Sequence, residues 1–367
     1  MKIQTSEYCA VGHPDRTCDF IVAYILDRYL ETDKNARVAL EVQLKDHYCT
    51  LSGEVSSNCR FADTELANFC RDAIRSVGYT DEYRSRWGEE NAISAEAVEV
   101  TVHVSQQSPD IAQGIDRDGW GDQGIFWGMA VNDPEHGYMP KDYYFAREIA
   151  NALMENRIGG LDIKTQVTCK DGVPVECVVA IPLLSDEDNG VNDRIVREIK
   201  NRFGENCAVI VNGTGRYVKH GSIGDCGTTG RKLVVDFYGG NAKIGGGSPW
   251  GKDPTKADVT LNILAREKAL RYLRERGLNE VHCSISCCIG RVRFASRITT
   301  AKADASKAGS KTIRRATSSR SLRFAVQDMP RRVAQGFSAT RGRKLPRQTG
   351  RGKGDCVQKN LLLNRES

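Results

Sequence analysis

Hydrophobic and polar positions follow two different periods along the first 290 residues, and the period changes several times. Apolar residues recur at the spacing of one helix face in four segments: 16–31, 63–78, 142–157 and 254–276. Apolar positions alternate with polar ones, or run together briefly, in six others: 38–45, 48–55, 96–105, 165–170, 174–184 and 232–238. We expect 48–55 to pair with 38–45, and 174–184 with 165–170. This order predicts an α+β fold with helices on one face of mainly antiparallel sheets.

Two of the predicted helices have recognisable ends. Asp63 or Thr64 suits the N-cap of the helix over 63–78, and Gly78 suits its C-terminal stop. For the helix over 254–276, Asp253 suits the N-cap and Pro254 the first helical position, where a missing N–H costs nothing.

Composition places the chain among globular proteins. Of its 367 residues, 27% are charged and 40% are hydrophobic, and no apolar run approaches the roughly 20 residues that span a bilayer. The first ten residues lack the basic and apolar regions of a secretory signal, so we expect a cytoplasmic protein with no membrane partner. Its 13 Cys residues form no C-x-x-C pair and are expected to be reduced thiols.

Periodicity and acidic residues are both lost after residue 290. Residues 291–367 hold 20 Lys and Arg against 4 Asp and Glu, a net charge of +16, whereas residues 1–290 have a net charge of −10. Such a basic segment with few apolar residues predicts disorder or loose structure. A basic extension that binds nucleic acid or another polyanion is the other interpretation.

The glycine-rich stretch 224–258 is the main candidate for chemistry, with nine glycines, five Lys or Arg and four Asp. The backbone N–H groups of glycines can approach an anion closely because no side chain intervenes. Lys252 and Lys256 flank the expected start of the helix, where the helix dipole favours negative charge. Asp225 and Arg231 stand where a P-loop needs Gly and Lys, and no G-x-G-x-x-G opens a helix after a first strand. A polyphosphate held with a metal ion fits this composition, and a flexible surface loop with solvated lysines is the alternative.

Two other loops and two strands carry polar side chains that are candidates for binding a ligand or a metal ion. In 12–20, His13 suits phosphate contact or proton transfer and Asp15 is a natural Mg²⁺ ligand, with a plain turn and helix cap as the alternative. The Gly- and Asp-rich segment 105–124 is expected to close over a ligand, unless it is only a solvated loop. Glu41 and Glu54 lie on alternating strands, where they either contact a ligand or face solvent.

Several of these stretches together resemble the signatures of the S-adenosylmethionine synthetase family. Six of them are similar to family motifs and occur in the family's order between about residues 5 and 290: "GHPDRTCD", "QQSPDIAQG", "GDQGIFWGMA", "DIKTQVT", "GTGRYVKHGSIGDCGTTGRKLVVDFYGG" and "GGGSPWGKDPTKAD". Six motifs in order make a highly specific match.

The resemblance implies a fold and a reaction. The fold would be three interleaved α+β units in a pseudo-threefold arrangement, divided here into 1–107, 108–220 and 221–290, with 291–367 as a tail. The activity would be that of a methionine adenosyltransferase: the sulfur of L-methionine attacks C5′ of ATP, and the expelled triphosphate is hydrolysed to phosphate and diphosphate. The cofactors would be two Mg²⁺ per site and K⁺, and the assembly a homodimer or a dimer of dimers.

The resemblance also assigns roles to individual residues. The catalytic set would be His13, Lys164, Arg231, Lys232 and Lys252. ATP would be held by these five and by Asp162, Arg216, Tyr217, Asp225 and Ser248. Methionine would be held by Glu54, Gln107, Asp225 and Lys256. Metal ligands would be Asp15 and Asp258 for Mg²⁺ and Glu41 for K⁺. The gating loop would include Ile111, Gly114, Asp116, Gly121 and Asp122.

The chain departs from the family pattern in four places. Arg16 replaces the usual Lys of the first motif, residues 248–250 read Ser-Pro-Trp where the family usually has Ala-Phe-Ser, and the gating loop is several residues short. After residue 290 the expected paired strands and helices are absent, so we interpret 291–367 as an out-of-frame or degenerate replacement. A catalytically inactive or folding-defective relative with a polyanion-binding tail is therefore the alternative function.

Overall fold

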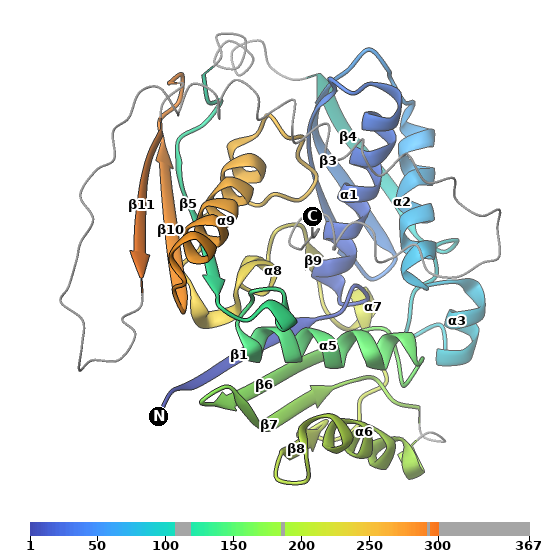
Figure 1. The fold of residues 1–367 in the computed structure, drawn as a ribbon. Coiled ribbons are helices and arrows are strands. Elements are labelled where there is room, and N and C mark those ends of the chain that lie inside the picture. The colour runs from blue at the N-terminus through green and yellow to red at the C-terminus, as the bar shows by residue number, and fades with distance from the viewer. Residues whose placement is uncertain (107–118, 185–187, 292–293, 301–367) are drawn as a thin grey trace, which may run out of the picture.

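Three sheets organise the part of the chain that the computed structural model describes, residues 1–106, 119–184, 188–291 and 294–300 (Figure 1). Their strand orders are β4-β3-β2-β9, β1-β6-β7-β8 and β11-β10-β5. The strands are β1 (Ile3–Cys9), β2 (Arg37–Lys45), β3 (Tyr48–Ser56), β4 (Glu99–Gln106), β5 (Gly124–Val131), β6 (Lys164–Lys170), β7 (Val173–Ala180), β8 (Ala208–Val211), β9 (Gly227–Thr228), β10 (Glu280–Cys287) and β11 (Phe294–Thr300). The helices are α1 (Pro14–Thr32), α2 (Asp63–Val77), α3 (Asp81–Trp87), α5 (Lys141–Glu155), α6 (Asp188–Phe203), α7 (Gly221–Gly224), α8 (Leu233–Phe237) and α9 (Ala257–Arg276), with 3-10 turns at Pro134–His136 and Gly239–Asn241.

The sheet β4-β3-β2-β9 follows the predicted alternation. In β2 the apolar residues Val38, Leu40, Val42 and Leu44 are buried. Helices α1 and α2 cover this buried face and share one apolar core with the strands. Strands β2 and β3 pair as the predicted antiparallel hairpin, whereas β4 pairs parallel with β3. The opposite face of β2 and β3 carries Glu41 and Glu54, the acidic side chains that the sequence singled out on these strands.

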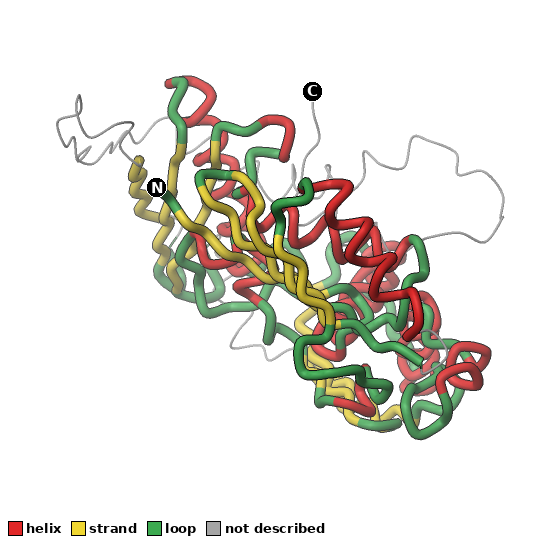
Figure 2. The backbone as a smooth tube through the Cα atoms, turned by 90° about the horizontal axis from the view of Figure 1, so that it is seen from below, coloured by secondary structure: helices red, strands yellow, loops and turns green. Residues whose placement is uncertain are grey.

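The sheet β1-β6-β7-β8 is built on the second predicted strand pair. Strands β6 and β7 pair antiparallel, and β1 adds along β6 over its whole length. Helices α5 and α6 contribute their apolar residues to one core with this sheet. Figure 2 shows strands crossing the middle of the molecule in the view from below, with helices running alongside.

The sheet β11-β10-β5 packs against α9. At Gly128 in β5, a Cβ would lie 2.1 Å from the carbonyl carbon of Ala265 in α9. No side chain fits between two backbones at that distance, so glycine is required for this strand and helix to approach so closely. The predicted helix over 254–276 is thus confirmed and is fixed to the sheet at this point.

Strand β11 corrects the expectation that no paired strand follows residue 290. Phe294–Thr300 pairs antiparallel with β10, and its seven side chains are mostly exposed. An exposed edge strand needs little apolar alternation because backbone hydrogen bonds to its neighbour hold it, which is why its sequence gave no strand signal. Residues 301–367, which carry most of the basic tail, lie outside the described residues.

The three units are interleaved along the chain, as predicted. The N-terminal strand β1 joins β6, strand β9 joins β2, and β5 joins β10. Each sheet therefore combines strands from more than one of the segments 1–107, 108–220 and 221–290, whose boundaries stay predictions.

The expected strand over 232–238 is wrong, because Leu233–Phe237 forms the short helix α8. A short apolar run does not distinguish a strand from a buried helical turn. In this turn Val235, Asp236 and Phe237 are all buried, and Asp236 contacts Arg16 in α1. A buried carboxylate with a partner on another element thus fixes the helical turn.

The predicted N-caps of two helices are also wrong. Helix α2 begins after Ala62 rather than Asp63 or Thr64, although Gly78 ends it as predicted, with a φ of 118°. Helix α9 begins after Lys256 rather than Asp253. The carboxylate of Asp253 is already used in the preceding turn, where it accepts hydrogen bonds from the Thr255 N–H and hydroxyl. The helix can therefore start only after that turn.

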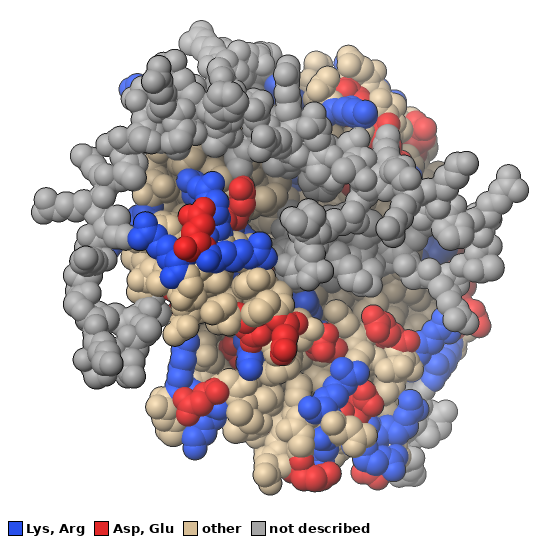
Figure 3. Space-filling model, in the orientation of Figure 1, with Lys and Arg blue, Asp and Glu red and all other residues tan. Residues whose placement is uncertain are grey.

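Both signs of charge are exposed on the described surface. On the face in Figure 3, Lys, Arg and carboxylate side chains lie together over α9, whose exposed charged residues are Glu267, Arg271, Arg274, Glu275 and Arg276. Within the described ranges, none of the helices has both the length and the apolar character needed to cross a bilayer.

Candidate active site

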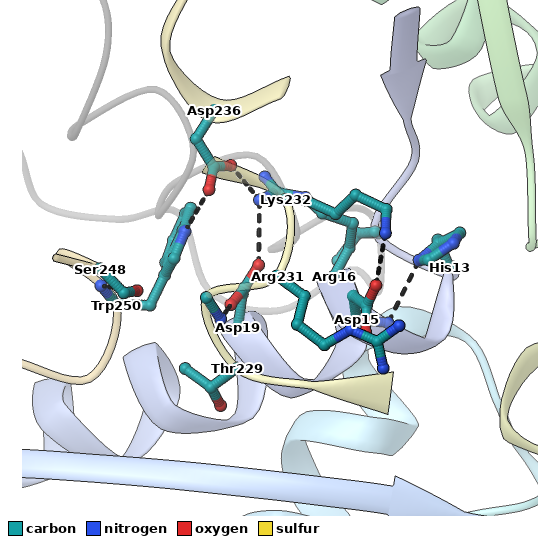
Figure 4. Close-up of polar contacts among 12 residues, drawn as sticks. His13, Asp15, Arg16, Asp19, Thr229, Arg231, Lys232, Asp236, Ser248 and Trp250 are labelled. Atoms are coloured by element: carbon teal, nitrogen blue, oxygen red, sulfur yellow. Dashed lines mark hydrogen bonds and ion pairs between the residues drawn. The ribbon is translucent and has the colours of Figure 1, made fainter. Parts of the chain in front are cut away.

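The first turn of α1 holds a buried carboxylate between two cations. The Asp15 side chain is 1% exposed and accepts hydrogen bonds from the Thr228 N–H at 2.9 Å and from Lys232 Nζ at 2.5 Å. The Nε atom of Arg231 lies 3.6 Å from the same carboxylate. The turn between β9 and α8 thus brings both cations to Asp15 (Figure 4). We call His13, Asp15, Arg231 and Lys232 the Asp15 group.

His13 is a neutral hydrogen-bond donor in this group. It is buried at the N-cap of α1, where its Nδ1 accepts from the Asp15 N–H at 3.1 Å. Burial, and after it the positive charges of Lys164 and Lys232, lower the pKa of His13 to about 3. Because a neutral imidazole carries one proton and Nδ1 is an acceptor, the proton lies on Nε2. The ring therefore offers one N–H to a ligand at neutral pH.

Asp162 lies next to this group with one free carboxylate oxygen. Its Oδ2 accepts from the Gly221 N–H at 3.0 Å, whereas Oδ1 is buried with no hydrogen-bond partner among the described residues. Burial raises the pKa of Asp162 to about 6. The Tyr217 hydroxyl donates to the Asp162 carbonyl at 3.1 Å. A buried acceptor without a partner is costly, so Oδ1 is suited to receive a donor from a ligand.

The first turn of α9 holds a second carboxylate paired with a lysine. Lys252 Nζ donates to Asp258 Oδ2 at 2.6 Å. The backbone of Gly247 lies against this carboxylate, since a Cβ there would be 1.9 Å from Asp258 Oδ1. Lys252 is bridged to Ala39 of β2, which joins this loop to the first sheet. We call Lys252, Lys256 and Asp258, together with Glu54, the Asp258 group.

The charges of Lys256 and Glu54 interact within the Asp258 group. Burial lowers the pKa of Lys256, while the charges of Asp253 and then Glu54 oppose that shift. Lys256 Nζ lies 3.9 Å from Asp253. Glu54 lies opposite Ala39 in the β2–β3 pairing, and Ala39 is bridged to Lys252. The open face of the first sheet and the glycine-rich loop thus come together here.

Two of the departures noted in the sequence contact each other away from the surface. The guanidinium of Arg16 lies 4.9 Å from the ring centroid of Trp250, and both side chains are 3% exposed. Arg16 also contacts Asp19 and Asp236, while Trp250 Nε1 donates to Asp236 at 2.8 Å. The bulky residue at 250 is therefore part of the hydrophobic core.

The remaining predicted residues belong to neither the Asp15 group nor the Asp258 group. Asp225 and Glu41 are exposed, and Asp122 is exposed with its carbonyl accepting from Cys287 Sγ at 3.4 Å. Arg216 donates to the Leu183 carbonyl at 3.4 Å. The Ser248 hydroxyl accepts from the Trp250 N–H at 3.2 Å. Lys164 is exposed at the start of β6, and Gly121 is partly buried. Four predicted residues lie outside the described residues: Gln107, Ile111, Gly114 and Asp116.

The sequence interpretation missed the residues that support the charged groups. Asp19 accepts from the Gly230 N–H at 2.8 Å, and Asp253 accepts from the Val38 N–H at 2.8 Å. Asp236 was read as part of a strand, although a carboxylate within an apolar run signals a buried partner. Arg16 and Asp19, three residues apart and directly before the apolar run 20–26, gave the same signal.

Comparison with known families gives two matches along the chain. The N-terminal domain of S-adenosylmethionine synthetase matches residues 1–109, and its C-terminal domain matches residues 219–333. The second match continues past residue 290, where the recognisable motifs end. The expectation that the tail loses all family resemblance at that point therefore does not hold for its first part.

Curated relatives and a solved structure are similar over most of their length. The S-adenosylmethionine synthase of Synechococcus sp. (strain CC9311) is 35% identical over 329 residues, covering 78% of this chain and 75% of the relative. S-adenosylmethionine synthase 2 of Rhodospirillum rubrum is 36% identical over 307 residues, covering 78% and 76%. The structure of an unusual S-adenosylmethionine synthetase from Campylobacter jejuni is 27% identical, with a TM-score of 0.76 over 94% of this chain and 91% of that one.

Proposed function

Because this chain belongs to the S-adenosylmethionine synthetase family, we propose that it joins L-methionine to ATP by attack of the methionine sulfur on C5′. The chain is a methionine adenosyltransferase, and the comparisons give no support to a catalytically inactive relative. The expelled triphosphate is then hydrolysed to phosphate and diphosphate. The thioether sulfur is a neutral nucleophile that needs no base, so positioning and charge stabilisation carry the chemistry.

The observation that carries this proposal is the pair of Lys–Asp contacts, Lys232–Asp15 and Lys252–Asp258. A triphosphate leaving group gains negative charge as the C5′–O bond breaks, and lysine and arginine side chains stabilise that charge. Each pair contains one cation suited to phosphate and one carboxylate suited to a hard cation. When the triphosphate binds, each lysine exchanges its carboxylate for a phosphate oxygen, which frees the carboxylate for a metal ion.

The family uses metal ions, and both carboxylates fit Mg²⁺. Oxygen donors are the ligands that Mg²⁺ prefers in proteins, and it usually takes one or two carboxylates together with phosphate oxygens. We assign Asp15 and Asp258 to two Mg²⁺ ions, and Glu41 on the open face of the first sheet to K⁺. Bound Mg²⁺ would neutralise charge on the leaving triphosphate.

His13 and its neighbours hold the phosphate end of ATP. The Nε2–H of His13 donates to the triphosphate near the breaking bond, and it does so as a neutral ring. Lys164, Arg231, Lys232 and Lys252 supply positive charge. In this role His13 aligns the leaving group rather than transferring a proton to it.

The nucleoside and the amino acid bind on either side of the reacting atoms. The unpartnered Oδ1 of Asp162 accepts a hydrogen bond from the nucleoside, assisted by the residues Arg216, Tyr217, Asp225 and Ser248. Methionine carries an ammonium and a carboxylate, which match Glu54 and Lys256 in the Asp258 group, with Asp225 and Gln107 completing its site. The gating segment around Gly121 and Asp122 closes over these substrates. A homodimer or a dimer of dimers, located in the cytoplasm, is the proposed working form.

The test is formation of S-adenosylmethionine by the purified full-length chain given ATP, L-methionine, Mg²⁺ and K⁺. A Lys252→Ala variant is measured beside it, because it removes one phosphate-binding cation without touching the core. Product from the parent that is largely lost in the variant supports the proposal. A folded parent that forms no product overturns it. The same preparation, applied to immobilised nucleic acid at increasing salt, tests polyanion binding by the basic tail.

A further inference from the structure

A buried cluster centred on Arg16 lies directly behind both charged groups. Arg16, Asp19, Asp236 and Trp250 are each at most 3% exposed. One guanidinium nitrogen, Nη1, donates to Asp19 at 3.0 Å and also to Asp236. The central carbon of the same guanidinium lies over the ring of Trp250, 4.9 Å from its centroid. The cluster is shielded from solvent, so none of its four side chains is available to a substrate.

The second oxygen of each carboxylate extends the cluster into a chain of contacts. Asp19 Oδ1 accepts from the Gly230 N–H at 2.8 Å, and Asp236 Oδ2 accepts from Trp250 Nε1 at 2.8 Å. The chain of contacts therefore runs from Gly230 through Asp19, Arg16 and Asp236 to Trp250, and Figure 4 shows its part from Asp19 to Trp250. Every oxygen of the two buried carboxylates has a donor, as buried charges require.

Each end of this chain is next to a cation of the proposed site. Gly230 directly precedes Arg231 and Lys232, and Trp250 lies two residues before Lys252. Arg16 itself follows Asp15, and Asp236 lies on the helix that begins after Lys232. The cluster thus contacts the three segments that carry Asp15, Lys232 and Lys252.

We propose that Arg16 is a positioning residue, which with Trp250 holds the two cation-bearing segments, 228–232 and 248–252, at fixed places against α1. This inference rests on the proposed function, since it concerns the residues that would hold the triphosphate. Arg16 contacts no substrate; it acts by placing Arg231, Lys232 and Lys252. A displacement of about 1 Å at such residues can reduce a rate on the order of 100-fold.

The geometry requires arginine at position 16 because of its shape. A planar guanidinium can lie over the Trp250 ring and donate to two carboxylates at the same time, whereas an ammonium is a compact point charge on a shorter stem. Lys at position 16 keeps the charge but loses the guanidinium that lies over the Trp250 ring and the reach of Nη1. The two departures from the family pattern, Arg16 and Trp250, are therefore two halves of one contact in this chain.

The experiment compares Arg16→Lys, Trp250→Phe and the double variant with the full-length parent. Arg28→Lys is the matched control, because Arg28 is on the same helix, stacks on Tyr24 and is 35% exposed. Two quantities are measured on folded protein well below each melting temperature: kcat with KM for methionine, and the affinity for inorganic tripolyphosphate by calorimetry. We expect Arg16→Lys to lower kcat about 10- to 100-fold and to weaken tripolyphosphate binding. The KM for methionine should change less than about twofold, since Glu54 and Lys256 lie outside the cluster.

The double variant separates positioning from general loss of stability. If Arg16 and Trp250 act through one contact, the kcat of the double variant is about that of Arg16→Lys alone. Two independent effects would instead multiply, so that the double variant would have a lower kcat than either single variant. Folded Arg16→Lys with a kcat and a tripolyphosphate affinity within about twofold of the parent overturns the inference. If Arg16→Lys does not fold, Trp250→Phe carries the same test, because it keeps an aromatic ring at position 250 while it removes the Nε1 donor to Asp236 and part of the indole area.

Tripolyphosphate binding also separates this inference from the proposed function. A parent that binds tripolyphosphate but makes no S-adenosylmethionine contradicts the function. In that case weaker binding by Arg16→Lys, with unchanged binding by Arg28→Lys, still supports positioning by the cluster.

Discussion

The Asp15 group and the Asp258 group use the same local design in different surroundings. In each, an aspartate in the first turn of a long helix pairs with a lysine from a glycine-rich segment. The Asp15 side chain is 1% exposed and has a backbone donor and a second cation nearby, whereas the Asp258 side chain is 19% exposed and is enclosed mainly by the backbone of Gly247. The first pair is thus held by buried polar contacts and the second by close steric fit. We therefore expect loss of charge to destabilise the Asp15 group more, and added volume to disturb the Asp258 group more.

Neutralising each aspartate is expected to have the largest effect. Asp15→Asn and Asp258→Asn each remove a proposed Mg²⁺ ligand, and we expect kcat to fall on the order of 10²–10³-fold in both. Stability should separate them: Asp15→Asn loses a buried, hydrogen-bonded charge and costs about 1–3 kcal/mol, while Asp258→Asn costs less than about 1 kcal/mol. Urea denaturation measures the difference, and equal losses of stability would contradict the comparison.

Added volume at Gly247 is expected to affect only the Asp258 group. The Cβ of Gly247→Ala would overlap the Asp258 carboxylate, so the pair with Lys252 must move, and we expect kcat to fall on the order of 100-fold. Gly246→Ala is the matched control, because no atom lies within 4 Å of its Cβ position. Steady-state rates of the two variants check this; comparable rates would show that the fit at Gly247 is not needed.

The Asp15 group should make stability depend on pH through His13. Its pKa is about 3 in the folded chain against 6.5 for an ordinary histidine, so between these values the unfolded chain binds more protons. The free energy of unfolding should therefore fall as pH is lowered from 6.5 toward 3, by up to about 1.4 kcal/mol per pH unit for this group. His220, with a pKa lowered to about 4 by burial, adds a similar slope. Urea denaturation at pH 7, 6 and 5 should show a smaller loss in His13→Gln than in the parent, and identical slopes would contradict it.

The smallest expected effect concerns the methionine end of the Asp258 group. Glu54→Gln removes a charge near Lys256 but no proposed phosphate ligand, so we expect the KM for methionine to rise about tenfold with kcat little changed, because a hydrogen bond to a charged group contributes about 1.5–3 kcal/mol. Glu99→Gln, an exposed change on β4 of the same sheet, is the control. A fall in kcat with unchanged KM would place Glu54 on the phosphate side instead.

Local patterns in the sequence were sufficient for most helices and strands. Helix α2 with its Gly78 stop, the hairpin of β2 and β3, and the pair of β6 and β7 all follow their apolar periods. Prediction failed where tertiary contacts decide, as at α8, where buried Asp236 needs Arg16, and at β11, where a neighbouring strand supplies the hydrogen bonds. Periodicity reports which face of an element is buried, and it does not report the partner of a buried charge.

The sequence by itself identified the family through its motifs, and it supplied the cations and carboxylates that we propose to hold a triphosphate and its metal ions. Only the tertiary structure decided how these groups are held. It paired Lys232 with Asp15 and Lys252 with Asp258 across 217 and 6 residues of chain, and it buried Arg16 against Trp250. The physical reason is that residue type and spacing fix what a side chain can do, whereas the partners of a charge in a low-dielectric interior depend on which distant segments the fold brings to it.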